Sequence, residues 1–193
     1  MLLRLALVCT ALSSAFGAVA QTAPPARADA INEFTENVEG GWIISGWHAA
    51  DGEAFCAMRG EFRSGTDLDI VVAGGNTERY TFVFRNAAWR SIQPNQELSL
   101  RFVLPGQGNW TITVRGSQPF EGKNGFSFTT SLQNSSNDSF PVEFMLASGM
   151  SIYRDGVAVD HFNLTGTRAG MLALARCAGT LRNLPHFDPF SGR

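Results

Sequence analysis

The chain has 193 residues and a formal net charge of −2 at pH 7, and it contains three cysteines. Its positive charges are almost all arginine, with Lys123 as the single lysine, and they form no basic cluster along the sequence. Nucleic acid and anionic membranes are therefore poor candidates for partners.

Residues 1–20 have the pattern of a secretory signal peptide. Arg4 supplies the positive start, an apolar run extends from Leu5 to Phe16, and residues 18–20 form a small-x-small cleavage site. The run is too short to span a bilayer, which needs about 20 apolar residues. We therefore expect a periplasmic or secreted protein that starts near Gln21 and has no transmembrane segment after signal removal.

The rest of the chain, roughly 170 residues, suits a single domain. The segment after the signal is rich in alanine and proline and has no periodicity, which predicts a disordered leader. Phe34 and Val38 are four residues apart and indicate a turn of helix within residues 31–39. The predicted organisation is a signal peptide at 1–20, a leader at 21–38, a single β-rich domain at 39–183 and a tail at 184–193.

Apolar and polar residues alternate with period two along most of the predicted domain. This pattern, interrupted by glycine, proline and asparagine, predicts antiparallel strands with one face toward water. The fold class is therefore mainly β, an antiparallel β-sandwich or barrel-like body with a short carboxyl-terminal helix. The predicted strands lie at 42–48, 53–59, 66–73, 79–85, 97–104, 109–115, 126–132, 150–154 and 157–164, with a short helix at 140–148.

Two Asp-Gly pairs, at residues 51–52 and 155–156, are typical of tight hairpin turns. A two-residue turn at 51–52 would place Trp47 opposite Cys56, whereas a longer loop over 49–52 would shift that register.

A helix that carries Cys177 is predicted near the carboxyl end. Thr165 or Thr167 is expected to cap its start, and Gly179 is expected to end it. Its buried face is predicted from residues at i, i+3, i+4, i+7 and i+11, which are Gly170, Ala173, Leu174, Cys177 and Leu181.

Two cysteines, Cys56 and Cys177, remain after signal removal. In an exported chain this number predicts one disulfide, which would clamp the helix onto the first hairpin. Trp42 and Trp47 belong to that hairpin, so we expect at least one of them to contact the bridge or the helix.

Few residues suggest catalysis. Asp67 and Asp69 share one face of a strand and are the main acid/base or calcium candidates, but the apolar residues on the opposite face, Leu68, Ile70 and Val72, indicate that the aspartates lie on a solvated outer face. His161 and Asp160 would point to opposite faces of a strand and so would not act together. His48 with Asp51 and Glu53, and the polar run 134–138, are better explained as turns than as metal sites. No catalytic residue, metal or cofactor is predicted.

The segment Phe162-x-Leu164-x-Gly166, followed by Ala169, Leu174 and Cys177, resembles a pattern in small exported proteobacterial proteins of unknown function. One named group that it resembles is the periplasmic accessory protein associated with type VI secretion. The resemblance implies a non-enzymatic role in the cell envelope.

We therefore expect a non-catalytic exported protein that binds an envelope protein partner or supports an envelope assembly. Phe187 and Phe190, in the predicted tail, are candidates for partner contact. One alternative is a small secreted hydrolase that uses Asp67 and Asp69; another is a secreted inhibitor or host-contact protein. A cleft holding the two carboxylates would favour the enzyme, and an exposed apolar patch would favour the binder.

Overall fold

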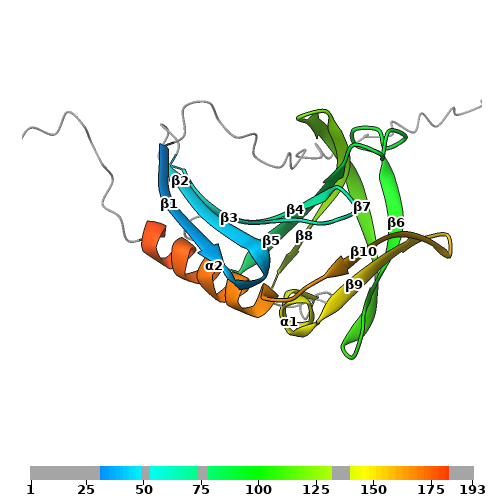
Figure 1. Ribbon diagram of the computed structural model, residues 1–193. Coiled ribbons are helices and arrows are strands. Elements are labelled where there is room, and N and C mark those ends of the chain that lie inside the picture. Colours follow the sequence, from blue (N-terminus) through cyan, green and yellow to red (C-terminus); the bar gives the residue numbers. More distant parts are fainter. Residues whose placement is uncertain (1–30, 49–52, 74–77, 132–139, 183–193) are drawn as a thin grey trace, which may run out of the picture.

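The computed structural model describes residues 31–48, 53–73, 78–131 and 140–182 (Figure 1). They form one antiparallel sheet of ten strands in the order β1-β2-β3-β4-β5-β8-β7-β6-β9-β10, with a short helix and a long carboxyl-terminal helix packed inside its curve. The mainly β, antiparallel body with a carboxyl-terminal helix is therefore confirmed. The elements are β1 (Ile31–Val38), η1 (Glu39–Gly41), β2 (Trp42–His48), β3 (Ala54–Glu61), β4 (Thr66–Ala73), β5 (Arg79–Asn86), β6 (Glu97–Leu104), β7 (Gly108–Phe120), β8 (Lys123–Ser131), α1 (Phe140–Leu146), β9 (Gly149–Arg154), β10 (Val157–Asn163) and α2 (Thr167–Arg182).

Alternation in the sequence explains most strands. In β6, Leu98, Leu100 and Phe102 are buried, while Ser99 and Arg101 between them are exposed. Phenylalanines fill the middle of the core: ring centroids of neighbouring strands and of α1 lie 5.1–6.5 Å apart among Phe82, Phe84, Phe102, Phe126, Phe128, Phe140 and Phe144. Such aromatic pairs add to the stabilisation from the apolar area that they bury.

The sheet curls until its last strand meets an early turn. The ring of Phe162 on β10 lies 4.8 Å from the ring of Phe62, which follows β3. The carboxylate of Asp160, also on β10, accepts hydrogen bonds from the hydroxyls of Ser64 and Thr66. The β3–β4 turn and the far edge of the sheet are thereby brought together.

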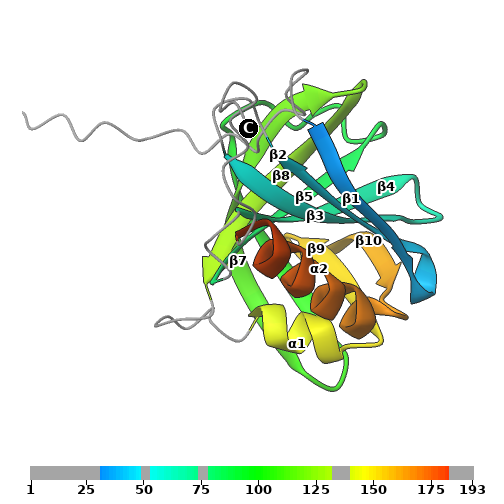
Figure 2. The same cartoon turned by 90° about the vertical axis from the view of Figure 1, so that its left-hand side faces the viewer.

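Helix α2 covers the inner face of β2 and β3, with α1 beside it (Figure 2). The predicted disulfide between Cys56 on β3 and Cys177 on α2 is confirmed, and both residues are buried. Gly46 is required for this approach, because a Cβ there would lie 2.8 Å from the Cys177 Sγ atom and 3.4 Å from the Cys56 Sγ atom.

The ends of α2 differ from the prediction. The helix has 16 residues and continues through Gly179, so this glycine does not end it. The residue directly before the helix is Gly166, whose φ of 79° favours glycine and whose carbonyl accepts from the Gly170 amide. Neither threonine provides the expected cap: the Thr165 hydroxyl donates to Asn163, and the buried Thr167 hydroxyl has no hydrogen-bond partner among the described residues.

The beginning of the domain is also corrected. Residues 31–38, predicted as the end of a leader with a turn of helix near Phe34, form strand β1 and pair antiparallel with β2. The four-residue spacing of Phe34 and Val38 was misleading because residues four apart share one face in a strand as well as in a helix, and both side chains pack against the core.

The register of the first hairpin differs by one residue from the two-residue-turn prediction. Cys56 pairs with Gly46, and Trp47 pairs with Phe55, whose ring stacks on it with centroids 5.2 Å apart. The expected tryptophan contact with the helix is made by Trp42, whose Nε1 donates to the Thr165 carbonyl at 3.1 Å and whose ring lies against Gly170.

In the part of the chain that the structure describes, no helix has the length and apolarity needed to cross a membrane.

Candidate ligand-binding cleft

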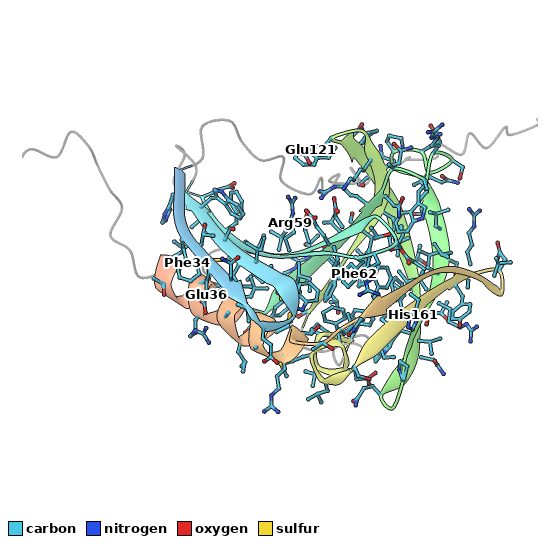
Figure 3. The ribbon with its side chains drawn as sticks, viewed as in Figure 1. Phe34, Glu36, Arg59, Phe62, Glu121 and His161 are labelled. Atoms are coloured by element: carbon cyan, nitrogen blue, oxygen red, sulfur yellow. A yellow bond between two sulfur atoms is a disulfide. The ribbon has the colours of Figure 1, made fainter. Side chains whose placement is uncertain are left out.

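An open cleft of about 570 Å³ lies where the sheet closes on itself. We call it the closure cleft. Three separate parts of the chain form it: the start of β2 with η1, the end of β3 with the following turn, and the end of β10. Its lining consists of Gly40, Gly41, Trp42, Gly60, Glu61, Phe62, Arg63, Ser64, His161, Asn163 and Thr165. Phe62 and His161, from two of these parts, are labelled in Figure 3.

The floor of the closure cleft is aromatic. The rings of Trp42 and Phe62 meet edge to face with centroids 5.8 Å apart, and Phe62 in turn meets Phe162. Gly60 leaves room for the indole, because a Cβ there would lie 2.6 Å from a Trp42 ring carbon. An apolar floor with polar groups around it is typical of small-ligand and peptide sites.

One wall is built by two backbone segments in direct contact. A Cβ on Gly40 would lie 2.0 Å from the Thr165 carbonyl oxygen, and a Cβ on Gly166 would lie 2.0 Å from the Glu39 carbonyl oxygen. Both glycines also have positive φ, so no other residue fits at either position without strain. The start of α2 is thereby fixed against η1, and the cleft wall is held rigid.

A buried polar clamp holds β10 in place on the opposite side. The Asn86 side-chain amide donates to the Thr66 hydroxyl at 2.8 Å and to the Ser64 carbonyl at 3.1 Å, and the hydroxyls of Ser64 and Thr66 donate to Asp160. Thr66 is fully buried. Because an unsatisfied buried polar group costs about 1–3 kcal/mol, removal of one member would loosen the clamp.

The rim of the closure cleft carries a negatively charged and a positively charged side chain. Glu61 and Arg63 flank Phe62 and are exposed, so one carboxylate and one guanidinium face solvent beside an aromatic ring. His161 adds an imidazole whose Nδ1 lies 2.8 Å from the Ser151 hydroxyl oxygen on β9. The Asp160 carboxylate binds the backbone amide of His161 and the Ser64 and Thr66 hydroxyls, so it does not orient the imidazole.

Asp67 and Asp69 lie elsewhere, on the outer face of β4, and their surroundings differ from the prediction. They are 9% and 7% exposed, so they do not form a solvated face. Asp69 binds Arg59 at 2.7 Å and Arg85 at 2.5 Å, while Asp67 binds Lys123 at 2.6 Å. The hydrogen bond with Asp69 raises the pKa of Arg59 above its ordinary value, against the opposing effect of burial.

These ion pairs explain the burial. Arg85 comes from β5, Lys123 from β8 and Arg59 from β3, so cations on both sides of β4 neutralise its two carboxylates. The Phe120 ring, at the tip of the β7–β8 hairpin, lies 5.1 Å from the Arg85 guanidinium and shields it. The cluster joins neighbouring strands, and neither aspartate lines the closure cleft.

Several residues that the sequence suggested as site candidates lie outside the described part of the chain. They are Asp51, the polar run 134–138, Phe187 and Phe190. Among the described residues, no group of three or more His, Cys, Asp or Glu side chains could hold a metal ion.

Sequence reasoning missed the closure cleft itself. Its one sequence signal is the row of polar residues at 161, 163 and 165, which alternate with the buried Phe162 and Leu164.

Comparison with known proteins adds no relative: no family model, curated protein or solved structure matches the chain.

Proposed function

We propose that the protein is an exported, non-catalytic binding module of the bacterial cell envelope, and that a protein partner binds at the closure cleft. The observation that carries this proposal is the cleft, which combines an aromatic floor with a rim that bears a carboxylate, a guanidinium, an imidazole and several hydroxyl and amide groups. Such a lining offers apolar contact and hydrogen bonds to an inserted loop or side chain of a partner.

The rigidity of the cleft supports a binding role. The Gly40–Thr165 and Gly166–Glu39 contacts fix one wall, and the Asp160 clamp fixes another. A preformed site loses little conformational entropy when a partner binds, which favours affinity. Asp67 and Asp69, the residues of the hydrolase alternative, are instead paired with cations on another face of the sheet.

Export is proposed from residues 1–20 and is supported by the disulfide, since such bonds persist mainly in oxidising compartments. An envelope role also follows from the resemblance to exported proteobacterial proteins, including the accessory protein associated with type VI secretion. Amino-terminal sequencing of protein from the periplasm should give a start at or near Gln21. A chain that keeps Met1 and stays in the cytoplasm would contradict export.

Site-specific photo-crosslinking tests the binding role. Replacement of Arg63, on the cleft rim, by benzoylphenylalanine should give a discrete cross-linked product in envelope extracts. Arg90 is an exposed arginine in the turn between β5 and β6 and provides the matched control. The same products from both positions, or none from position 63, would contradict a partner at the closure cleft.

One observation favours a second candidate, a small hydrolase. The Ser151 hydroxyl and the His161 imidazole are within hydrogen-bond distance, which is the first requirement for an activated serine. A fluorophosphonate probe that labels the native protein but not the S151A variant would favour the hydrolase. Absence of labelling in both would favour the binding module.

A further inference from the structure

Exposed apolar side chains gather on the solvent side of the two helices. Of the five large apolar residues that are exposed in the described chain, three lie there: Val142 and Leu146 on α1, and Leu172 on α2. They are 41%, 50% and 50% exposed. The two helices are in contact and lie side by side in Figure 2. We call this area the helix-pair surface; its members are Val142, Met145, Leu146, Arg168, Leu172 and Arg176.

The exposed members repeat at helical spacing on both elements. Val142 and Leu146 are four residues apart on α1, and Arg168, Leu172 and Arg176 follow one another at the same spacing on α2. Residues four apart share one face of a helix, so each helix presents a ridge to solvent. Such ridges are the surface on which a further helix packs. An extended strand would gain no hydrogen-bond ladder here, because helices satisfy their own backbone groups.

A hollow of about 280 Å³ lies at one end of the helix-pair surface, between the end of α1 and the start of α2. It shares only Thr165 with the closure cleft, and Arg168 is the one charged residue in its lining. Four of its lining residues have apolar side chains: Met145, Leu146, Ala147 and Leu164. An apolar hollow beside an exposed ridge is suited to one anchoring side chain of a bound helix.

The exposed charges of the helix-pair surface are positive. Arg168 is exposed and forms no ion pair with any described residue. Helix α2 contains no acidic residue, and its other exposed arginine on this surface, Arg176, binds Glu36 on β1 at 3.2 Å. Glu143, the acidic residue of α1, is half-buried and accepts from the Trp110 Nε1 atom at 2.7 Å. An acidic partner therefore complements this surface.

We propose that the helix-pair surface binds an amphipathic helix of a protein partner, with acidic residues beside its apolar stripe. The stripe lies against Val142 and Leu172, one aliphatic side chain enters the hollow beside Leu146, and a carboxylate pairs with Arg168. The contact uses a different face from the closure cleft and does not depend on the function proposed for that cleft.

Two other occupants fit the surface less well. In a two-fold contact between two copies of α2 centred on Leu172, Arg168 of each copy would lie opposite Arg176 of the other, and like charges in opposition disfavour the contact. A lipid surface requires a helix whose main apolar face is free, whereas that face of α2 packs on β2 and β3.

Nuclear magnetic resonance titration of the disulfide-bonded protein tests the proposal. The probe is a capped helical peptide of about five turns with leucines along one face and glutamates beside them, and its control has lysines in place of the glutamates. The glutamate peptide should shift the amide signals of residues 142–146 and 168–176 saturably, and bind about tenfold more tightly than the lysine peptide. Equal binding of the two peptides, no shift up to about 1 mM, or shifts confined to the closure cleft would overturn the proposal.

Matched variants locate the apolar contact. L172S should weaken the glutamate peptide about tenfold, because it removes a large apolar side chain from the centre of the contact. V157S provides the control, since Val157 is a 69% exposed valine on β10, and it should leave affinity unchanged. Both side chains are exposed, so neither change should lower the melting temperature. Equal weakening by the two variants, or none by L172S, would refute the assigned surface.

Charge reversal tests the acidic character of the partner helix. R168E should reduce the preference for the glutamate peptide over the lysine peptide about tenfold, because it replaces attraction by repulsion. R90E makes the same change at an exposed arginine in the turn between β5 and β6 and should leave the preference unaltered. Equal effects of the two variants would reduce the interaction to general charge attraction and refute the site.

Three further arms test the identity of the occupant. A dimer in sedimentation analysis that L172S abolishes would show that a second copy covers the surface. A chain shortened to residue 182 that binds the glutamate peptide at least about tenfold more tightly would show that the protein's own carboxyl end covers it. Binding to vesicles of phosphatidylcholine and phosphatidylglycerol that L172S abolishes would show a lipid surface. Each of these results would refute a partner helix, and their joint absence supports it.

Discussion

Replacement of both disulfide cysteines by alanine should destabilise the protein strongly. Cys56 and Cys177 are separated by 121 residues, and the chain-entropy relation for a loop of this size gives about 5 kcal/mol at 25 °C. Native disulfides usually contribute about 2–5 kcal/mol, so this loop lies at the upper end. For a domain of this size, such a loss corresponds to a fall in melting temperature of about 4–20 °C.

Equilibrium urea unfolding, followed by circular dichroism and by tryptophan fluorescence, measures the loss. Hydrogen exchange then locates it: amides of α2 should lose protection before those of β6 and β7, because the bridge ties α2 to β3. Reduction of the unaltered protein should reproduce both effects and serves as the control. A loss below about 1 kcal/mol, or loosening that spares α2, would refute the view that the bridge secures the helix.

Three other perturbations test particular contacts. D69N should destabilise the fold by about 3–5 kcal/mol in urea unfolding, because Arg85 would be buried without its partner, and a change under 1 kcal/mol would contradict this. D160A should cost about 1–3 kcal/mol and increase hydrogen exchange in β10, since the buried Thr66 hydroxyl would lose the acceptor for its proton; unaltered exchange there would show that the clamp is dispensable. Burial raises the pKa of Tyr80, so its contribution to stability is complete below about pH 10 and is lost as pH rises through the raised pKa. Y80F should therefore remove part of the alkaline loss of stability, and an unchanged pH profile would argue against this group.

Alternation in the sequence was sufficient to place strands such as β6, because one face of each is apolar and each hairpin is local. It was insufficient for β1, because Phe34 and Val38 are only partly buried at the edge of the sheet and leave a weak pattern. The first hairpin shows a second limit. Its register depends on the length of its loop. The observed register differs by one residue from that of a two-residue turn, so Gly46 rather than Trp47 lies opposite Cys56.

The outer face of β4 and the closure cleft were beyond prediction for a common reason. Alternation indicates that Asp67 and Asp69 leave the apolar core, but not which cations of other strands lie beside them. The cleft depends on contacts between Asp160 and residues 94 and 96 positions away, which exist only because the whole sheet curls. By contrast, the disulfide was predicted from the number of cysteines and the signal-like pattern of residues 1–20, and neither requires knowledge of how the sheet curves.

The position of α2 at the end of the chain has a consequence for biosynthesis. The apolar residues of β2 and β3 that it covers, Trp42, Ile44 and Met58, are made more than a hundred residues earlier than the helix. During synthesis, at about 5–20 residues per second, this surface has no cover for several seconds, and exposed apolar surface of this kind promotes aggregation. A chain interrupted before Thr167 would retain a bare apolar sheet and an unpaired Cys56 thiol. Chaperones or proteases would thus recognise an incomplete chain by features that the finished molecule hides.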